Sequence, residues 1–366
     1  MSAADDERYM ARALRLARRG LRTTDPNPRV GCVLVRGGQV IGEGFHRRAG
    51  EAHAEVVALR ACGDARGATA YVTLEPCSHH GRTPPCADAL IEAGLARVVY
   101  ASRDPNPEVD GRGAERLVKA GIEVVPGVLE AEARELNPGF LSRMERGRPW
   151  VRLKLAASLD GRTALASGES RWITGEAARA DVQQWRARAS AILTGIGTVL
   201  ADDPRLDVRL RGQRRQPLRV VLDSHGRLPA SARILEPPGE VLWLTAEGAM
   251  AAKRPDGLPP TVQWQELPRS GPGIDLAAVL SLLAARGINE LHVECGPRLA
   301  GGWLRAGLVD ELVLYVAPSL LGEGARPLAM IGDPASLAAA PGFSIHSAGR
   351  VGSDLRIVLR PGEGAG

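Results

Sequence analysis

The clearest chemical pattern is one histidine, one glutamate and two cysteines within residues 53–86. His53-Ala54-Glu55 opens this segment, and Cys77 and Cys86 each follow a proline. An imidazole and two thiolates suit Zn²⁺, and three protein ligands leave the fourth tetrahedral position open for water. A carboxylate two residues after the histidine can take a proton from that water and pass it to a leaving amine. The pattern predicts a catalytic zinc site with Glu55 as proton shuttle.

Each half of this pattern also occurs without a metal. A His-x-Glu at a helix start is commonly polar surface, and two cytosolic thiols can simply be buried apolar groups. Four chemically matched groups, in order within one short segment, favour the metal site over both explanations.

The chain has 366 residues, enough for two domains with separate cores. Its formal net charge of +5 suits phosphorylated small molecules as well as nucleic acid, so charge alone does not choose between them. Five cysteines, an odd number without a dense framework, are typical of a reducing compartment. The polar first residues and the lack of a long apolar run predict a cytoplasmic protein without a signal peptide or membrane span.

The first part of the chain alternates strands with helices, which predicts a three-layer α/β domain. The expected strands are 30–35, 39–42, 70–74, 97–101 and 122–125. The expected helices are 5–19, 55–62, 84–94, 112–120 and an interrupted one at 130–144. Cys86 then falls in the first turn of a helix, where the positive terminus favours its thiolate.

The sequence Arg146-Gly147-Arg148-Pro149 is the best domain boundary, so we expect one domain at 1–146 and another at 147–366. The second domain also alternates strands and helices, which predicts a second α/β core. Its expected strands are 150–155, 191–194, 219–223, 241–245, 290–294 and 311–316, and its expected helices are 176–187, 276–285 and 299–306. Residues 254–273, rich in Pro and Gly, indicate a surface loop.

The first domain resembles the cytidine-deaminase superfamily and, within it, the deaminase of riboflavin biosynthesis. The matching residues are Pro26-Asn27-Pro28-x-Val30-Gly31, His53-Ala54-Glu55, and Thr73-Leu74-Glu75-Pro76-Cys77-Ser78-His79-x-Gly81-x-Thr83-Pro84-Pro85-Cys86. Eight residues separate the two cysteines, and this long loop is similar to the riboflavin branch rather than to the general nucleobase-deaminase pattern.

This resemblance implies one Zn²⁺ ligated by His53, Cys77 and Cys86, with Glu55 as proton shuttle. It also implies that the amide of Asn27 contacts the pyrimidine, because an amide can donate to and accept from a base edge. A further set of polar residues either lines the pocket or lies on exposed loops: His46, His79, His80, Asp104 and Asn106.

Two segments with small residues follow expected strands of the second domain, 194–198 and 294–302. Glycines between a strand and a helix let backbone N–H groups approach a phosphate. Neither segment has the G-x-G-x-x-G pattern, and each fits a tight turn equally well. Two such segments on one parallel sheet favour a nucleotide site, because ligands bind beyond the carboxyl ends of strands.

The second domain resembles the reductase domain of the bifunctional riboflavin deaminase/reductases, through 155–172, 194–209, 222–224 and 293–302. The resemblance implies a dihydrofolate-reductase-like α/β fold that uses NADPH, although the residues themselves do not separate NADPH from NADH. The implied cofactor contacts are Ala156, where the family more often has Gly, and Trp172, Thr198, Asp202, Ser224, Gly296, Pro297, Arg298, Leu299, Ala300, Gly301 and Gly302. The implied substrate contacts are Lys154, Ser170, Arg186, Leu206, Arg209 and Glu294.

These residue types suit a ribityl-phosphate substrate. Arg186 and Arg209 can each clamp a phosphate through two hydrogen bonds, and Glu294 can accept from sugar hydroxyls. Lys154 and Asp202 are candidates for charge stabilisation and proton transfer beside the nicotinamide.

Together the resemblances imply a two-step enzyme. The first domain would deaminate 2,5-diamino-6-(5-phosphoribosylamino)pyrimidin-4(3H)-one, and the second would reduce the ribose of the resulting aminouracil to a ribityl chain. The expected partners are small phosphorylated pyrimidines and further copies of the chain, without nucleic acid or membrane.

Two other functions fit part of the sequence. An RNA-editing deaminase would share the zinc pattern, but the second domain has few aromatic residues for base stacking and no basic run. A structural zinc module beside a nucleotide-sensing domain would need a fourth protein ligand, for which His79 and His80 are the nearby candidates.

Overall fold

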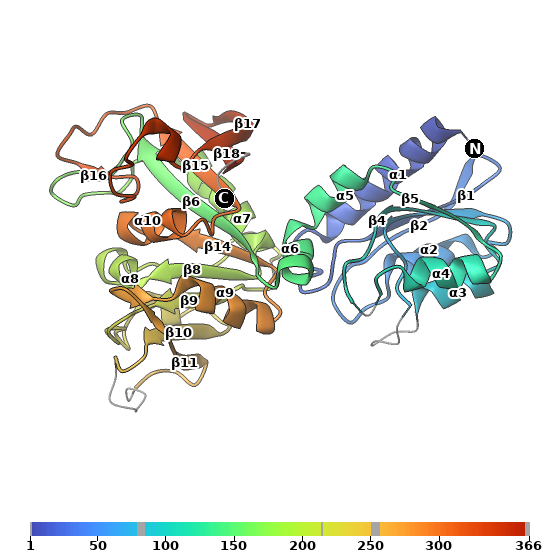
Figure 1. Ribbon diagram of the computed structural model, residues 1–366, viewed down its shortest axis with the longest axis horizontal. Coiled ribbons are helices and arrows are strands. Elements are labelled where there is room, and N and C mark those ends of the chain that lie inside the picture. Colours follow the sequence, from blue (N-terminus) through green and yellow to red (C-terminus); the bar gives the residue numbers. More distant parts are fainter. Residues whose placement is uncertain (1, 79–84, 108, 214, 250–256, 363–366) are drawn as a thin grey trace. The chain divides into compact units, whose positions relative to one another are not determined.

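The computed structural model describes residues 2–78, 85–107, 109–213, 215–249 and 257–362 (Figure 1). The chain forms two compact units, Met1–Arg148 and Pro149–Gly366. This division lies close to the boundary expected at 146/147. Within the described residues, no helix is long and apolar enough to cross a membrane.

The first unit is built on a five-stranded sheet in the order β2-β1-β3-β4-β5. Strand β1 is antiparallel to both neighbours, whereas β3, β4 and β5 are parallel. The strands are β1 (Gly31–Arg36), β2 (Gln39–Phe45), β3 (Thr69–Leu74), β4 (Arg97–Ser102) and β5 (Glu123–Pro126). The helices are α1 (Ala3–Ala17), α2 (Ala54–Cys62), α3 (Cys86–Glu92), α4 (Arg112–Lys119), α5 (Glu130–Leu136) and α6 (Pro138–Arg146).

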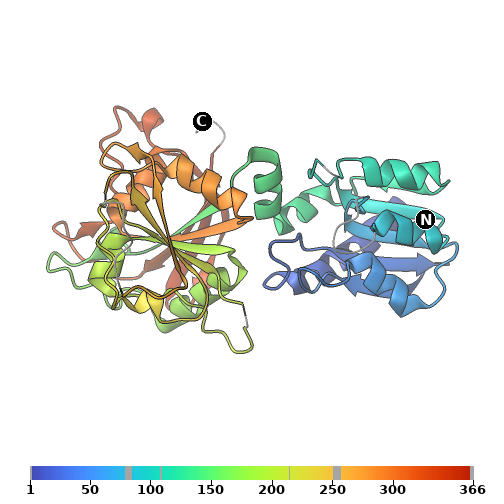
Figure 2. The same ribbon diagram turned by 90° about the horizontal axis from the view of Figure 1, so that it is seen from below.

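Helices cover both faces of this sheet (Figures 1 and 2). On β1, Cys32 and Leu34 pack with α2, α3 and α4, while Val33 and Val35 pack with α1 and α5. Because both faces are buried, the strand has a continuous apolar sequence rather than an alternating one. The predicted three-layer α/β domain is confirmed.

The second unit contains a nine-stranded sheet in the order β11-β10-β9-β8-β14-β6-β15-β18-β17. The strands from β11 to β15 in this order are parallel, and β18 and β17 complete the sheet with antiparallel pairings. These strands are β6 (Trp150–Ser158), β8 (Ala191–Gly195), β9 (Leu218–Leu222), β10 (Val241–Ala246), β11 (Val262–Leu267), β14 (Glu290–Glu294), β15 (Glu311–Ala317), β17 (Phe343–Val351) and β18 (Asp354–Pro361).

Helices also cover both faces of the second sheet. Val279 and Leu283 of α9 (Leu276–Ala285) and Trp303 of α10 (Pro297–Arg305) pack on one face. Ala178 and Val182 of α7 (Glu176–Arg188) pack on the other face. A shorter helix, α8 (Ile196–Asp202), follows β8. The predicted second α/β core is confirmed.

The structure differs from the expected elements at two places in this sheet. The expected surface loop at 254–273 contains β11, an edge strand whose only sheet partner among the described strands is β10. Strands β17 and β18 were not expected, and β17 is exposed along most of its length. Strands β11 and β17 are the two edges of the sheet, and edge strands keep polar side chains, so they lack the apolar pattern that identifies buried strands. Strand β18 lies between β15 and β17 and carries an apolar run at 357–359 that was not assigned to a strand.

A buried ion pair ties α1 to the first sheet. Asp6 of α1 accepts hydrogen bonds from Arg97 at 2.8 and 2.9 Å and from the Tyr71 hydroxyl at 2.7 Å. These contacts, above all the hydrogen bonds from Arg97, lower the pKa of Asp6 despite its burial. A carboxyl group with a lowered folded-state pKa stabilises the fold above its unfolded pKa of about 4 and loses that stabilisation as the pH falls through the folded pKa.

We expect Asp6→Asn to destabilise the first unit by about 2 kcal/mol at neutral pH, because the partly buried Arg97 loses one counter-charge and keeps only the exposed Glu123. The urea transition followed by circular dichroism should move to lower concentration, and the difference from wild type should shrink as the pH is lowered from 5 toward the folded pKa of Asp6. Glu7→Gln, exposed on the same helix, is the matched control. Tryptophan fluorescence should not shift, because all six tryptophans lie in the second unit. An unchanged transition at neutral pH would contradict this account.

Candidate functional site

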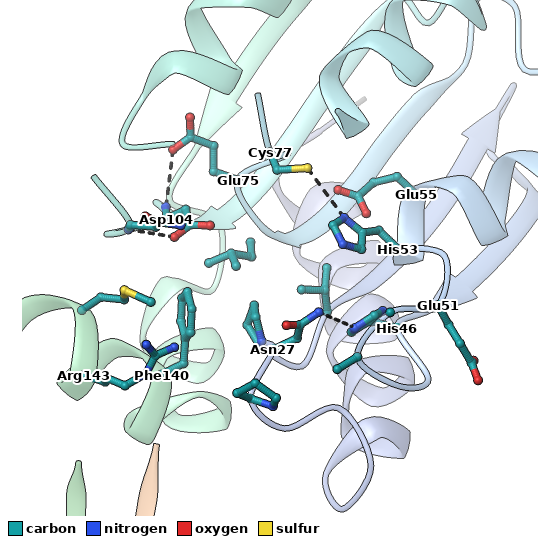
Figure 3. Close-up of a pocket in the computed structure, with 18 residues that line it drawn as sticks. Asn27, His46, Glu51, His53, Glu55, Glu75, Cys77, Asp104, Phe140 and Arg143 are labelled. Atoms are coloured by element: carbon teal, nitrogen blue, oxygen red, sulfur yellow. Dashed lines mark hydrogen bonds between the residues drawn. The ribbon is translucent and has the colours of Figure 1, made fainter. Parts of the chain in front are cut away.

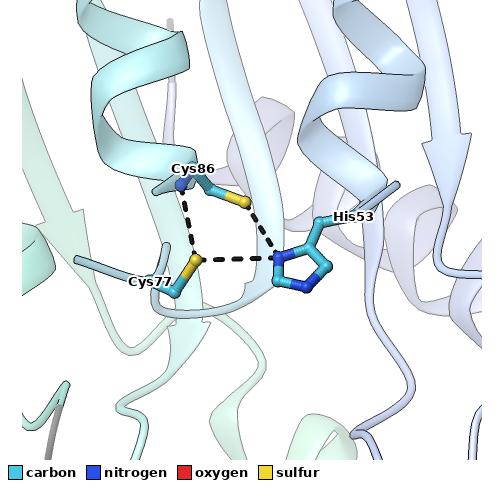
Figure 4. A group of neighbouring side chains, drawn as sticks. All are labelled: His53, Cys77 and Cys86. Carbon is cyan, nitrogen blue, oxygen red and sulfur yellow. Dashed lines mark hydrogen bonds between the residues drawn. The ribbon is translucent and has the colours of Figure 1, made fainter. Parts of the chain in front are cut away.

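The three predicted metal ligands meet in the first unit (Figure 4). His53 immediately precedes α2, Cys77 follows β3, and Cys86 is the first residue of α3. His53 Nδ1 lies 3.1 Å from Cys86 Sγ and 3.6 Å from Cys77 Sγ. One nitrogen and two sulfur atoms within 4.8 Å of one another form a donor set that fits Zn²⁺. Among the described residues, no other group of three or more His, Cys, Asp or Glu side chains is placed to hold a metal.

The two thiols of this cluster differ in proton affinity. A hydrogen bond from Cys86, together with one from His53, lowers the pKa of Cys77 to about 4 against the effect of burial. The same contact with Cys77, together with burial, raises the pKa of Cys86. The first turn of α3 was expected to favour the Cys86 thiolate, but the Cys86 N–H donates to Cys77 Sγ at 3.3 Å. The start of α3 therefore stabilises the thiolate of Cys77 rather than that of Cys86.

Glu55 lines the same pocket as His53 and Cys77 (Figure 3). It lies in the first turn of α2 and is 3% exposed. Burial raises its pKa to about 7, and the charge of His53 opposes that shift. A carboxyl group with a pKa near neutrality can both take up and release a proton, as a proton shuttle must.

A pocket of about 470 Å³ lies beside these groups, and Asn27 forms part of its wall. Asn27 Nδ2 lies 3.1 Å from His46 Nε2, and His46 Nδ1 lies 3.2 Å from the carbonyl oxygen of Ala52. Because a carbonyl can only accept, His46 Nδ1 donates to it and Nε2 accepts from the Asn27 amide. The amide of Asn27 is thereby oriented, with Oδ1 as the atom that can accept from a base edge.

The sequence left open whether five further polar residues line the pocket or lie on exposed loops, and they fall into two groups. His46, Asp104 and Asn106 line the pocket, whereas His79 and His80 lie outside the described residues. Asp104 Oδ1 accepts a hydrogen bond from the Asn106 N–H at 2.9 Å. Asp104 and Asn106 are thus held together in one turn at the pocket wall.

Glu75 lines the pocket, and the sequence suggested no role for it. Its carboxylate accepts hydrogen bonds from the backbone N–H groups of Gly111 and Ala114, both at 3.1 Å, and from that of Asp104 at 3.4 Å. The feature of the sequence that could have pointed to a role for Glu75 is its position in the motif around Cys77. The structure adds what it binds: the turn that carries Asp104 and the start of α4.

The start of α4 also packs tightly on the backbone beside Glu75. A Cβ atom at Gly113 would lie 1.9 Å from the carbonyl oxygen of Pro76. Only glycine allows this approach, and it brings α4 close enough for the Glu75 carboxylate to reach its first N–H groups.

The second unit brings Lys154, Arg186 and Glu294 together. Lys154 of β6 is the register partner of Glu294 of β14. Arg186 of α7 binds the Glu294 carboxylate through Nε and Nη2, at 2.5 and 2.9 Å. Burial acts to raise the pKa of Glu294, but Arg186 outweighs it and the pKa is lowered. Burial lowers the pKa of Lys154, with Glu294 opposing the shift.

Arg186 and Arg209 were both expected to bind a phosphate, and their contacts decide which of them has nitrogens accessible for it. The third nitrogen of the Arg186 guanidinium, Nη1, donates to the carbonyl oxygen of Asp207 at 3.2 Å, so all three nitrogens of this side chain have protein partners. Arg209 Nη1 contacts Asp207 Oδ1 at 2.5 Å, yet its side chain is 57% exposed. Arg209 is the more accessible of the two.

Leu206 has a buried side chain and a left-handed backbone, with φ of 48°. Its side chain packs in an apolar cluster with Ile196 and Val199 of α8. A contact between Leu206 and a substrate would therefore come from its backbone.

The two segments with small residues converge beyond the ends of β8 and β14. A Cβ at Gly195 would lie 3.0 Å from Leu299 Cδ2, and a Cβ at Gly296 would lie 4.0 Å from Thr198 Oγ1. A Cβ at Gly197 would meet no atom within 4 Å among the described residues. This open, glycine-lined space at the carboxyl edge of a parallel sheet fits the phosphates of a dinucleotide.

The other predicted cofactor residues are spread around this edge. Ser224 follows β9, and Asp202 ends α8. Ala156 packs in the apolar cluster under α7. Trp172 is 69% exposed, with the Arg179 guanidinium 4.4 Å from its ring. A Cβ at Gly301 would lie 2.0 Å from the carbonyl oxygen of Met330, so packing alone requires glycine there.

Comparisons with known proteins give a match for each of the two units. The family model described as "RibD C-terminal domain" matches residues 149–354, and the one described as "Cytidine and deoxycytidylate deaminase zinc-binding region" matches residues 3–102. The chain is 53% identical to the riboflavin biosynthesis protein RibD of Escherichia coli K12, over 97% of this chain and 99% of that protein. It is 46% identical to the protein of the same name from Haemophilus influenzae, over 96% of each.

Two solved structures also match this chain over nearly its whole length. Form 1 of Acinetobacter baumannii RibD superposes with a TM-score of 0.91 at 46% identity, over 99% of this chain and 100% of that one. The diaminohydroxyphosphoribosylaminopyrimidine deaminase/5-amino-6-(5-phosphoribosylamino)uracil reductase of Thermotoga maritima superposes with a TM-score of 0.88 at 37% identity, over 98% and 99%.

The hydrogen bonds of Glu75 generate a prediction. We expect Glu75→Gln to speed amide hydrogen exchange at Gly111 and Ala114 by at least about tenfold, because hydrogen bonds to a charged acceptor are replaced by those of a neutral amide. Exchange is read by mass spectrometry of peptides covering 104–114. Glu115→Gln, an exposed change on α4, should leave that exchange unaltered. Equal exchange in wild type and Glu75→Gln would show that Glu75 does not hold this segment.

Proposed function

The chain belongs to the RibD family, the bifunctional deaminase/reductases of riboflavin biosynthesis, and we propose which reaction each unit catalyses and through which residues. The first unit hydrolyses the amino group of 2,5-diamino-6-(5-phosphoribosylamino)pyrimidin-4(3H)-one. The second unit reduces the ribose of the product, 5-amino-6-(5-phosphoribosylamino)uracil, to a ribityl chain with NADPH.

The observation that carries the deaminase proposal is the buried carboxyl of Glu55 beside the converging ligand atoms of His53, Cys77 and Cys86. One zinc ion per chain, held by these three ligands, would act as a Lewis acid toward water. Glu55 takes a proton from the attacking water and delivers it to the departing ammonia. Asn27, oriented by His46, accepts from the pyrimidine edge and aligns the amino-bearing carbon.

The reductase proposal rests on the group formed by Lys154, Arg186 and Glu294. NADPH supplies the hydride, and the protein supplies orientation and charge. Glu294 is kept negative by Arg186, so it can accept hydrogen bonds from the sugar hydroxyls. Lys154, whose pKa is lowered mainly by burial, suits the delivery of a proton to the sugar oxygen.

The phosphate of the reductase substrate is assigned to Arg209, the more exposed of the two candidate arginines. The cofactor phosphates are assigned to the space between Gly195–Thr198 and Gly296–Gly302. An RNA-editing function is not supported, because residues 149–354 match the RibD C-terminal domain. Self-association and a cytoplasmic location remain predictions.

The first test separates the two activities. In Glu55→Gln we expect ammonia release to fall by at least about a hundredfold, because the amide cannot transfer a proton. Zinc content and NADPH oxidation with the aminouracil should persist. Asp64→Asn, an exposed carboxylate of the same unit, is the control. If ammonia release survived in Glu55→Gln, the proton-transfer role would be wrong.

The second test addresses the reductase site. Glu294→Gln removes the charge that compensates the buried Arg186, so we expect NADPH oxidation with the aminouracil to fall by about tenfold or more. Ammonia release from the diaminopyrimidine should stay at the wild-type rate. Glu240→Gln, an exposed change in the same unit, is the matched control. Normal NADPH oxidation by Glu294→Gln would remove Glu294 from the proposed site.

A further inference from the structure

One wall of the deaminase pocket is formed by α6, far along the chain from the zinc motif. Phe140, Arg143 and Met144 line the pocket, and the spacing of three and four residues places them on one side of the helix. In Figure 3 the guanidinium of Arg143 lies across the pocket from His53 and Glu55. The pocket thus has a reactive side at α2 and a second side at α6.

The position of α6 is set by contacts with the segment that carries Asn27. The side chain of Asn137 binds the backbone of Arg29 twice: Oδ1 accepts from its N–H at 2.8 Å, and Nδ2 donates to its carbonyl oxygen at 3.0 Å. One turn later, Phe140 packs against Leu74 and Val30. The start of the helix that carries Arg143 is therefore anchored to the base-contacting segment and to the end of β3.

The charges of the pocket are unevenly placed. Its carboxyl groups are those of Glu51, Glu55, Glu75 and Asp104. Among the lining residues that the structure describes, Arg143 is the one lysine or arginine. Burial lowers the pKa of Arg143, with the charge of Asp25 opposing the shift, but a guanidinium stays protonated. A half-buried cation binds an anion more strongly than one in water, because the local dielectric is lower.

We propose that Arg143 binds the 5-phosphate of the deaminase substrate at the α6 side of the pocket. This inference rests on the proposed deaminase function and adds the residue that selects a phosphorylated substrate. The pyrimidine lies between Asn27 and Glu55, and the ribose extends toward α6. This orientation keeps the phosphate dianion away from the Glu55 carboxyl and gives it the fork of N–H donors that a phosphate accepts.

The experiment compares two substrates, the phosphoribosyl diaminopyrimidine and the same compound without its phosphate, in wild type and Arg143→Gln. We expect Arg143→Gln to raise KM for the phosphorylated compound about tenfold to a hundredfold, with kcat changed by less than about threefold. KM for the dephosphorylated compound should be the same in both proteins. Arg60→Gln, an exposed arginine of α2 outside the pocket lining, should behave as wild type with both compounds.

Arg143→Lys provides a second variant that keeps the charge. It should recover part of the loss, because an ammonium is a point charge without the planar fork. Zinc content and NADPH oxidation, measured on the same samples, establish that each variant is folded. Ribose 5-phosphate should compete with the substrate in wild type more strongly than ribose does, and this difference should be lost in Arg143→Gln.

The outcomes separate this inference from the function on which it rests. If wild type releases no ammonia from the phosphorylated compound, the proposed deaminase function fails. If wild type is active and Arg143→Gln leaves KM unchanged, or raises it equally for both compounds, the phosphate assignment to Arg143 is overturned.

Discussion

The chemistry of the first unit depends on two helix starts meeting the end of one strand. His53 precedes α2, Cys86 begins α3, and Cys77 follows β3. The helices reach this point because their sheet-facing residues are small: Ala54, Ala58 and Ala87 are fully buried against the sheet. Larger side chains there would move the helix axes outward and separate donor atoms that a metal needs within a few ångströms.

The two buried glutamates that face the sites have pKa values shifted in opposite directions. Glu55 has no arginine or lysine partner among the contacts described, and burial raises its pKa to about 7. Glu294 is buried too, but the guanidinium of Arg186 outweighs that effect and lowers its pKa. One glutamate can therefore exchange a proton near neutral pH, while the other remains a fixed negative charge. The neighbouring charge, rather than the residue type, assigns these roles.

The deaminase pocket is assembled from segments that are distant in the chain. Its walls come from the loop before β1, the loop between β2 and α2, the start of α2, the end of β3, the turn after β4 and one side of α6. Glu75 connects the end of β3 to the turn after β4 through the backbone N–H of Asp104, and Asn137 connects α6 to the loop before β1 through the backbone of Arg29. The motif residues thus supply the reaction, while buried polar side chains set the shape in which it occurs.

The sequence alone was enough to predict the candidate metal ligands, the candidate proton shuttle and the two α/β cores, because short spacings and apolar runs record them locally. The place of α6 in the pocket could not be predicted in this way. No spacing rule connects Arg143 to Asn27, which lie more than a hundred residues apart and meet through the packing of Phe140 and the hydrogen bonds of Asn137. The same holds for Arg186: its sequence context suggested a phosphate clamp, and only the approach of α7 to β14 showed a carboxylate at its guanidinium. Local patterns encode residue chemistry and element type, whereas the partner of a buried charge is decided by which elements pack together.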